Sequence, residues 1–209
     1  MKHLSKTLAA AGLTALLSSA AFAAQVERVR GTVDKADGST LTIKTEDGKT
    51  ETVDVAGAKF AWVVPSSLDA IKDGVFIGTA TKGENPMTAL EVVLFPESMR
   101  GTGEGHYGWD SITDHTAGAG AKVKSAMTNG TVKADKAASG GERTLTVSYG
   151  KDGSKEIVVP SSAPIVAFEP ADKAILTPGS KVFAVVAKDG PKAEGKLVAV
   201  GKDGLTPPM

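Results

Sequence analysis

The residues with the greatest capacity for chemistry gather in one glycine-rich stretch, residues 99–115. His106 and His115 lie in it, together with the carboxylates of Glu104 and Asp110. Imidazole and carboxylate groups are common ligands of zinc, copper and other divalent ions, so these four residues form a candidate metal site. The nine-residue spacing of the histidines does not match a compact helical motif, and the chain has no cysteine to add a thiolate ligand.

The same stretch supports two other interpretations, which centre on Arg100, Tyr107 and Trp109. The glycines between them permit sharp turns, so the aromatic rings could pin this segment onto neighbouring strands while Arg100 forms hydrogen bonds. This pattern favours a structural clasp. Aromatic-rich loops are also typical contact sites, so partner binding is the alternative.

Motifs of catalysis are missing from the sequence. The Gly-x-Gly-x-Gly pattern at residues 101–105 is not followed by the Gly-Lys-Ser/Thr of a phosphate-binding loop. Gly-x-Ser-x-Gly, the nucleophile motif of many hydrolases, does not occur either. We therefore expect a non-enzymatic binding or scaffolding protein with no catalytic residues and no cofactor beyond a possible divalent metal ion. The alternative is a periplasmic metal-binding or metal-delivery protein that uses His106 and His115, and hydrolase activity is the least favoured option.

Charge and composition restrict the class of partner. The chain has 24 basic and 24 acidic residues, and aromatic residues make up 5% of it. Nucleic-acid binding requires a concentrated basic face and, for single strands, stacking aromatics, so this class is excluded. The expected partner is a periplasmic protein or a small ligand, and the sequence leaves the oligomeric state open.

The N-terminus has the organisation of a secretory signal. Lys2 and Lys6 precede an apolar run at residues 8–17, and Ala21-Phe22-Ala23 supplies a small-residue cleavage site. The apolar run is about half the length of a membrane span, and no later stretch is longer. We expect cleavage after Ala23 and a soluble periplasmic protein that is stabilised by packing, since it has no disulfides.

The remainder of the chain repeats one β pattern twice. Gly-Thr-Val, an alternating Leu-Thr-Ile/Val strand, an Asp-Gly turn and a Val-Phe strand recur in the same order about 100 residues later. The first copy has these motifs at residues 31–33, 41–43, 47–48 and 75–76, and the second at 130–132, 145–147, 152–153 and 182–183. Short strands with one helical turn in each copy predict an all-β fold of two tandem small barrels or meanders.

The expected organisation follows from the repeat. Residues 1–23 are the signal peptide, residues 25–97 the first β-barrel domain and residues 98–122 the connector that contains the candidate site. Residues 123–203 form the second β-barrel domain, and residues 204–209 a disordered tail. Each copy alone has a marginal core, so we expect the two to pack against each other.

Both copies resemble an exported bacterial family known as domain of unknown function 5666. The similarity rests on the Gly-Thr-Val opening, the Thr-Leu-Thr strand and the Asp-Gly hairpin, and more specifically on residues 99–110, 127–132 and 168–170. This resemblance implies OB-like barrels and export from the cytoplasm, and it implies no established activity.

Overall fold

The computed structural model describes residues 25–116, 120–137 and 139–209, so the predicted signal peptide lies outside the described residues. Strands dominate the described chain, which confirms the all-β prediction. They are β1 (Gln25–Asp37), β2 (Thr40–Thr45), β3 (Thr50–Asp54), β4 (Lys59–Pro65), β5 (Phe76–Lys82), β6 (Met87–Leu94), β7 (Gly105–Thr113), β8 (Lys122–Ala137), β9 (Arg143–Tyr149), β10 (Gly153–Val159), β11 (Ile165–Ala171), β12 (Lys181–Asp189) and β13 (Lys192–Gly201). Short 3-10 turns join them: η1 (Leu68–Ala70), η2 (Glu97–Met99), η3 (Ser139–Gly141), η4 (Lys173–Ile175) and η5 (Lys202–Gly204).

The sequence repeat is also a structural repeat. Strands β1 to β6 with η1 correspond in order to β8 to β13 with η4, and both helical turns form where the sequence predicts them. The two copies differ in the register of one strand pair. Val182 pairs with Gly31, whereas Gly130 pairs with Ile77, which lies two residues after Val75. The two Val-Phe motifs are therefore out of register by two residues. A shift of two leaves each side chain on the same face, so the sequence pattern does not reveal it.

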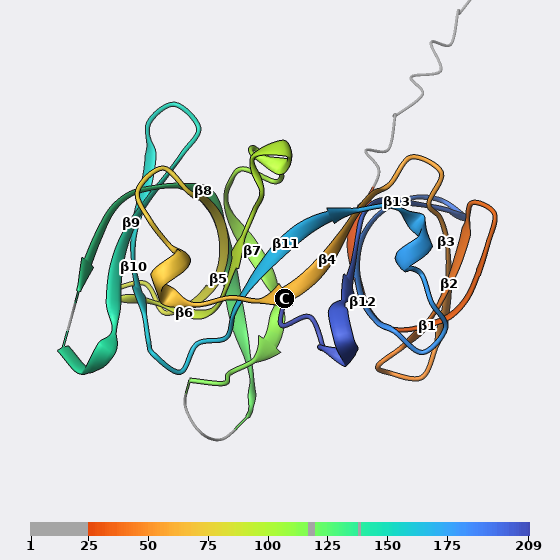
Figure 1. Ribbon diagram of the computed structural model, residues 1–209, viewed down its shortest axis with the longest axis horizontal. Coiled ribbons are helices and arrows are strands. Elements are labelled where there is room, and N and C mark those ends of the chain that lie inside the picture. Colours follow the sequence, from red (N-terminus) through yellow and green to blue (C-terminus); the bar gives the residue numbers. More distant parts are fainter. Residues whose placement is uncertain (1–24, 117–119, 138) are drawn as a thin grey trace, which may run out of the picture.

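Strands of the two copies pair with each other, which differs from the expectation that each copy forms its own barrel. One closed ring contains β1, β2 and β3 from the first copy and β12 and β13 from the second. The other contains β8, β9 and β10 from the second copy and β5 and β6 from the first. We call these the terminal ring and the central ring, and Figure 1 shows them side by side.

The exchange takes place through β4 and β11, which run between the rings and pair with each other in antiparallel orientation (Figure 1). β4 also lies parallel to β13 of the terminal ring, and β11 lies parallel to β6 of the central ring. Because β4 leaves the ring that contains β1 to β3, the strands that follow it enter the other ring. β11 returns the chain in the same way, so the boundary expected near residue 97 does not separate two folding units.

Each ring has its own apolar core, and a third core joins the rings. Leu41, Ile43 and Val198 belong to the core of the terminal ring, and Leu145 and Val92 to that of the central ring. The joining core contains residues of β4, β11 and β12, including Val63, Phe168 and Phe183. Stability thus depends on packing between the rings as well as within them.

The end of the chain also belongs to the joining core. Met209 is buried there, and Pro207 is buried too. The main-chain oxygen of Met209 accepts a hydrogen bond of 2.6 Å from Nε of Arg30. The prediction of a disordered tail at residues 204–209 is therefore wrong, because an apolar side chain and a buried acceptor hold this tail in place.

Candidate functional site

The segment that the sequence analysis treats as a connector contains a strand. Gly105 adopts a φ of 142°, which L-residues rarely adopt, and the chain then continues as β7. β7 pairs antiparallel with β8, from Gly105 opposite Asn129 to Thr113 opposite Lys122. Alternating contacts with β8 therefore fix the positions of the chemically capable side chains.

A bulge in β7 aims two side chains at the terminal ring. The register shifts between Gly108 and Ser111, which leaves Trp109 and Asp110 without opposite partners on β8. The guanidinium carbon of Arg28, on β1, lies 3.8 Å from the centroid of the Trp109 ring. At this distance a cation and an indole face attract each other, and Trp109 also lies 6.3 Å, centroid to centroid, from Phe183 on β12.

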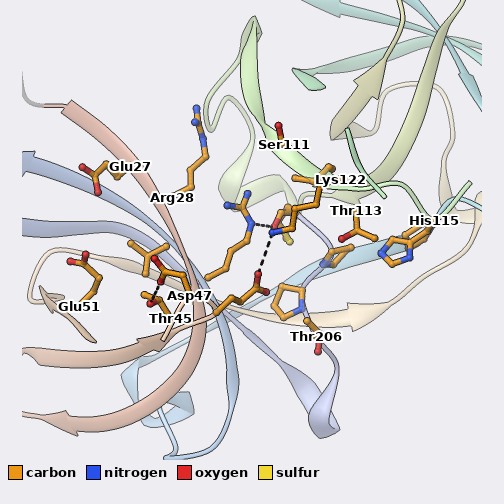
Figure 2. A pocket seen from close by; sticks show the side chains of 18 of the residues that line it. Glu27, Arg28, Thr45, Asp47, Glu51, Ser111, Thr113, His115, Lys122 and Thr206 are labelled. Carbon is orange, nitrogen blue, oxygen red and sulfur yellow. Dashed lines mark hydrogen bonds and ion pairs between the residues drawn. The ribbon is translucent and has the colours of Figure 1, made fainter. Parts of the chain in front are cut away.

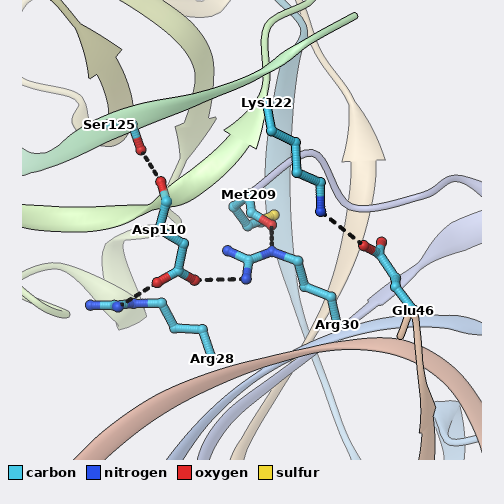
Figure 3. A network of polar contacts seen from close by, with 7 residues as sticks. All are labelled: Arg28, Arg30, Glu46, Asp110, Lys122, Ser125 and Met209. Carbon is cyan, nitrogen blue, oxygen red and sulfur yellow. Dashed lines mark hydrogen bonds and ion pairs between the residues drawn. The ribbon is translucent and has the colours of Figure 1, made fainter. Parts of the chain in front are cut away.

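Asp110 forms the polar half of the same contact. Its two carboxylate oxygens accept hydrogen bonds from Nη1 of Arg28 at 2.9 Å and from Nη1 of Arg30 at 2.7 Å (Figure 3). Its main-chain oxygen accepts a hydrogen bond of 2.7 Å from the Ser125 hydroxyl on β8. Asp110 thus contacts both rings, and one carboxylate neutralises only one of the two arginines.

Arg100 and Tyr107 contact the central ring and the connector itself. Arg100 forms an ion pair with Glu97. It also donates hydrogen bonds to the Gly74 carbonyl oxygen and to the Thr131 hydroxyl. Tyr107 donates its hydroxyl hydrogen to Gly103 O at 3.1 Å, and burial raises its pKa. Of the three residues assigned to the clasp, only Trp109 is seen to contact the terminal ring within the described chain, through Arg28 and Phe183, which the sequence did not single out.

The candidate metal ligands are not brought together. Nδ1 of His106 lies 2.9 Å from the Thr128 hydroxyl, and the Glu104 carboxylate accepts from the Gly150 N–H. His115 lies two residues beyond the far end of β7, and a strand rises about 3.3 Å per residue, so the part of β7 from His106 to Thr113 alone spans roughly 23 Å. Within the described residues no group of three or more His, Cys, Asp or Glu side chains could hold a metal ion. Metal binding through these residues stays a prediction.

The neighbours of the histidines have their own structural roles. The His106 ring stacks on Tyr149, with centroids 6.3 Å apart, and burial together with the charge of Lys155 lowers its pKa. Asp114 pairs with Lys82 and accepts from Thr116, and these hydrogen bonds lower its pKa to about 2. These contacts anchor both ends of β7 to the central ring.

A groove of about 1000 Å³ lies beside this contact (Figure 2). Its walls come from parts of the chain that are distant in sequence: residues 27–30 of β1, the β2–β3 hairpin, residues 111–115 at the end of β7, Lys122 of β8, Ser162 and Pro164 before β11, and the tail at residues 206–209. The charges of the lining are balanced: the basic residues are Arg28, Arg30, Lys49 and Lys122, and the acidic residues are Glu27, Glu46, Asp47 and Glu51. Such a groove suits an extended ligand with charged and uncharged groups better than a small apolar molecule.

Glu91 has the most strongly shifted pKa of the acidic groups in the described chain, and it is not among the residues that the sequence singled out. Its side chain on β6 is fully buried, and burial raises its pKa to about 8 despite a hydrogen bond from the Ala80 N–H and the charge of Arg30. Its second oxygen, Oε2, has no hydrogen-bond partner within the described chain. Glu91 does not line the groove.

Two sequence signals could have identified the missed residues. Arg28 and Arg30 are two apart in a strand, which places both cations on one face. Glu91 is the one charged residue in the apolar run at residues 89–95. A single carboxyl group in such a run is expected to be buried and to have a raised pKa.

Comparisons with protein-family models, curated proteins and solved structures give no match to this chain. No helix in the described part of the chain is long and apolar enough to cross a membrane. The function must therefore be argued from the geometry of the groove and the clasp.

Proposed function

We propose that this protein is an exported, non-catalytic binding module that holds a partner molecule in the groove between two OB-like barrels. The observation that carries the proposal is the groove itself, whose walls belong to both copies of the repeat and to the tail. Trp109 and Asp110 keep the two rings in contact beside it. In this proposal the clasp gives the groove a fixed width before a ligand arrives, which lowers the entropic cost of binding.

The position of the perturbed acid supports binding rather than catalysis. A carboxyl group with a pKa near 8 would suit general acid–base chemistry at neutral pH. Glu91 is buried away from the groove, however, so a ligand there would not reach it. The N-terminal signal pattern and the resemblance to domain of unknown function 5666 support export to the periplasm and the assignment of the rings as OB-like barrels.

Site-specific cross-linking in cells tests this proposal. A photoreactive amino acid at Ser111 or at Lys49, both in the groove, is expected to capture one and the same partner after illumination. The matched control is the same amino acid at Asp69, which is exposed on η1 outside the groove. Equal capture at all three positions, or none at the groove positions, would refute the proposal.

A further inference from the structure

The two rings differ at one equivalent strand edge. In the central ring, β8 bends at Gly130, and β5 occupies one of its edges at residues 126–131. On the opposite edge, β9 pairs with residues 131–137 and β7 pairs with residues 122–129. The edge of β8 opposite β5 is therefore covered along almost its whole length, by β7 and β9 in turn.

The equivalent strand of the terminal ring is β1, which bends at Gly31. β12 occupies one edge at residues 25–32, as β5 does on β8. β2 occupies the opposite edge only at residues 31–37. Among the described residues, no strand pairs with the remaining edge at residues 25–29, where β7 would stand if the repeat were complete. At the inner end of this edge, the Glu46 N–H donates to the Arg30 carbonyl oxygen at 3.2 Å.

This edge of β1 opens into the groove. Four consecutive residues, 27–30, line the groove. Side chains of consecutive strand residues alternate between the two faces, so a surface that all four reach must lie along the strand edge. Unpaired N–H and C=O groups at such an edge are a template for another strand.

The side chains beside the edge restrict what can be added. Val26, Arg28 and Arg30 share one face of β1 by the two-residue period. Val26 is 54% exposed and is the only exposed large hydrophobic side chain in the described chain. Arg28 and Arg30 share the carboxylate of Asp110, and Nε of Arg30 also donates to the main-chain oxygen of Met209, so this face of β1 presents two arginines beside one aspartate.

We propose that β1 accepts an extended segment of a partner protein as an additional antiparallel strand along residues 25–30, in the place that β7 has on β8. The inference rests on the proposed function and names the class of its ligand. Main-chain hydrogen bonds would supply affinity, and cross-strand side-chain pairs would supply selectivity. The segment would have acidic residues opposite Arg28 and Arg30 and an apolar residue opposite Val26.

A designed peptide tests this assignment on the full chain. The probe is acetyl-Glu-Thr-Glu-Lys-Val-Thr-amide, whose residues would face positions 30 to 25 in antiparallel order. Its affinity is measured by calorimetry, and its site by amide hydrogen exchange in NMR spectra. We expect alternate amide protons of residues 25–30 to become protected when the peptide is added.

Two variants and a pair of N-methylated peptides separate strand addition from simple charge attraction. Arg28→Glu is expected to weaken binding about tenfold or more, since it places like charges opposite each other. Lys124→Glu, on the edge of β8 that β7 already covers, is expected to leave the affinity unchanged. Two peptides that are N-methylated at alternate sets of residues should differ in affinity. Only one of the two sets of N–H groups would face β1, so methylation of that set should weaken binding more.

Three results would overturn the inference. The first is binding without protection of the β1 amides, or no binding. The second is protection, before peptide is added, of the alternate amides that point away from β12, which would mean that the chain's own residues cover the edge. The third is protection at residues 111–113 of β7 instead. Groove cross-linking that succeeds while these tests fail would leave the proposed function intact and reject only the strand assignment.

Discussion

The terminal ring and the central ring are built from equivalent strands, yet their first strands meet different surroundings. β8 is covered by β7, and its Met127 packs with the joining aromatic Trp109. β1 has Arg28 in the equivalent region, and the groove runs beside it. The strand pairing that both rings share is needed to close each ring. The edge of β1 that differs from β8 is the surface where we propose that a partner binds.

A second difference lies where each ring has a bulge. In the terminal ring the bulge follows Val185, which pairs with Leu197. In the central ring the bulge follows Ala80, which pairs with Glu91. A buried leucine and a buried glutamate thus occupy equivalent positions, so an apolar side chain fits this site.

The largest expected effect comes from removing this difference. Glu91 stays protonated in the folded state up to a pKa of about 8, whereas in the unfolded chain it ionises near 4.5. The folded state therefore holds more protons between these values, and the free energy of unfolding falls as pH rises from about 5 to 8, by roughly 1 kcal/mol per pH unit. Glu91→Leu should abolish this slope in urea denaturation curves that are recorded at several pH values.

The reciprocal change provides the control for Glu91. Leu197→Glu should introduce the same slope into the terminal ring, because its site is equally apolar. An unchanged slope in Glu91→Leu would show that other groups cause the pH dependence.

The next effect tests a feature that both rings share. A β-carbon at Gly31 would lie 2.2 Å from the Lys44 carbonyl oxygen, and one at Gly130 would lie 2.3 Å from that of Ser148. Alanine at either position must displace the neighbouring strand, so we expect each variant to lose about 3 kcal/mol of stability. Gly57→Ala, which meets nothing within 4 Å, is the matched control and should change the midpoint little. Unequal losses at Gly31 and Gly130 would contradict the equivalence of the two bends.

A smaller loss is expected at the contact between the rings. Trp109→Ala removes the indole from Arg28 and Phe183, and a half-buried aromatic contact of this kind contributes about 2 kcal/mol. Trp109→Phe keeps a ring beneath Arg28 and should recover part of the loss. Denaturation curves that coincide for all three proteins would show that Trp109 does not join the rings.

The smallest effect concerns the charge beside Trp109. Asp110→Asn leaves Arg28 and Arg30 facing each other without a carboxylate, which should cost about 1 kcal/mol at low salt and less at high salt. Asp37→Asn removes a carboxylate that pairs with Lys35 at the surface and should have almost no effect. A salt-independent loss at Asp110 would point to packing rather than charge.

Local features of the fold could be predicted from the sequence because neighbouring residues determine them. The Asp47-Gly48 hairpin forms as expected, with Gly48 at a φ of 82°. The second hairpin also forms, but its turn residue with positive φ is Gly150, and Gly153 already belongs to β10. Such hairpins depend on only a few consecutive residues.

The choice of partner strand could not be predicted, because the two copies are nearly interchangeable. β1 presents the same motif as β8, so the sequence pattern fits pairing within a copy and pairing between copies equally well. The arginines that the clasp contacts were missed for a related reason, since Arg28 and Asp110 are 82 positions apart in the chain. Residue types identified Trp109 and Asp110, whereas only the fold identified what they contact.

The exchange of strands also dictates the order in which a growing chain can fold. All strands of the central ring have been synthesised once residue 159 is added, and this ring can close early. β1 to β3 must wait for β13, which ends at residue 201, before their ring can close. Pairing over such long separations is slow, so the ring that contains the first-made strands stays open for the longest time.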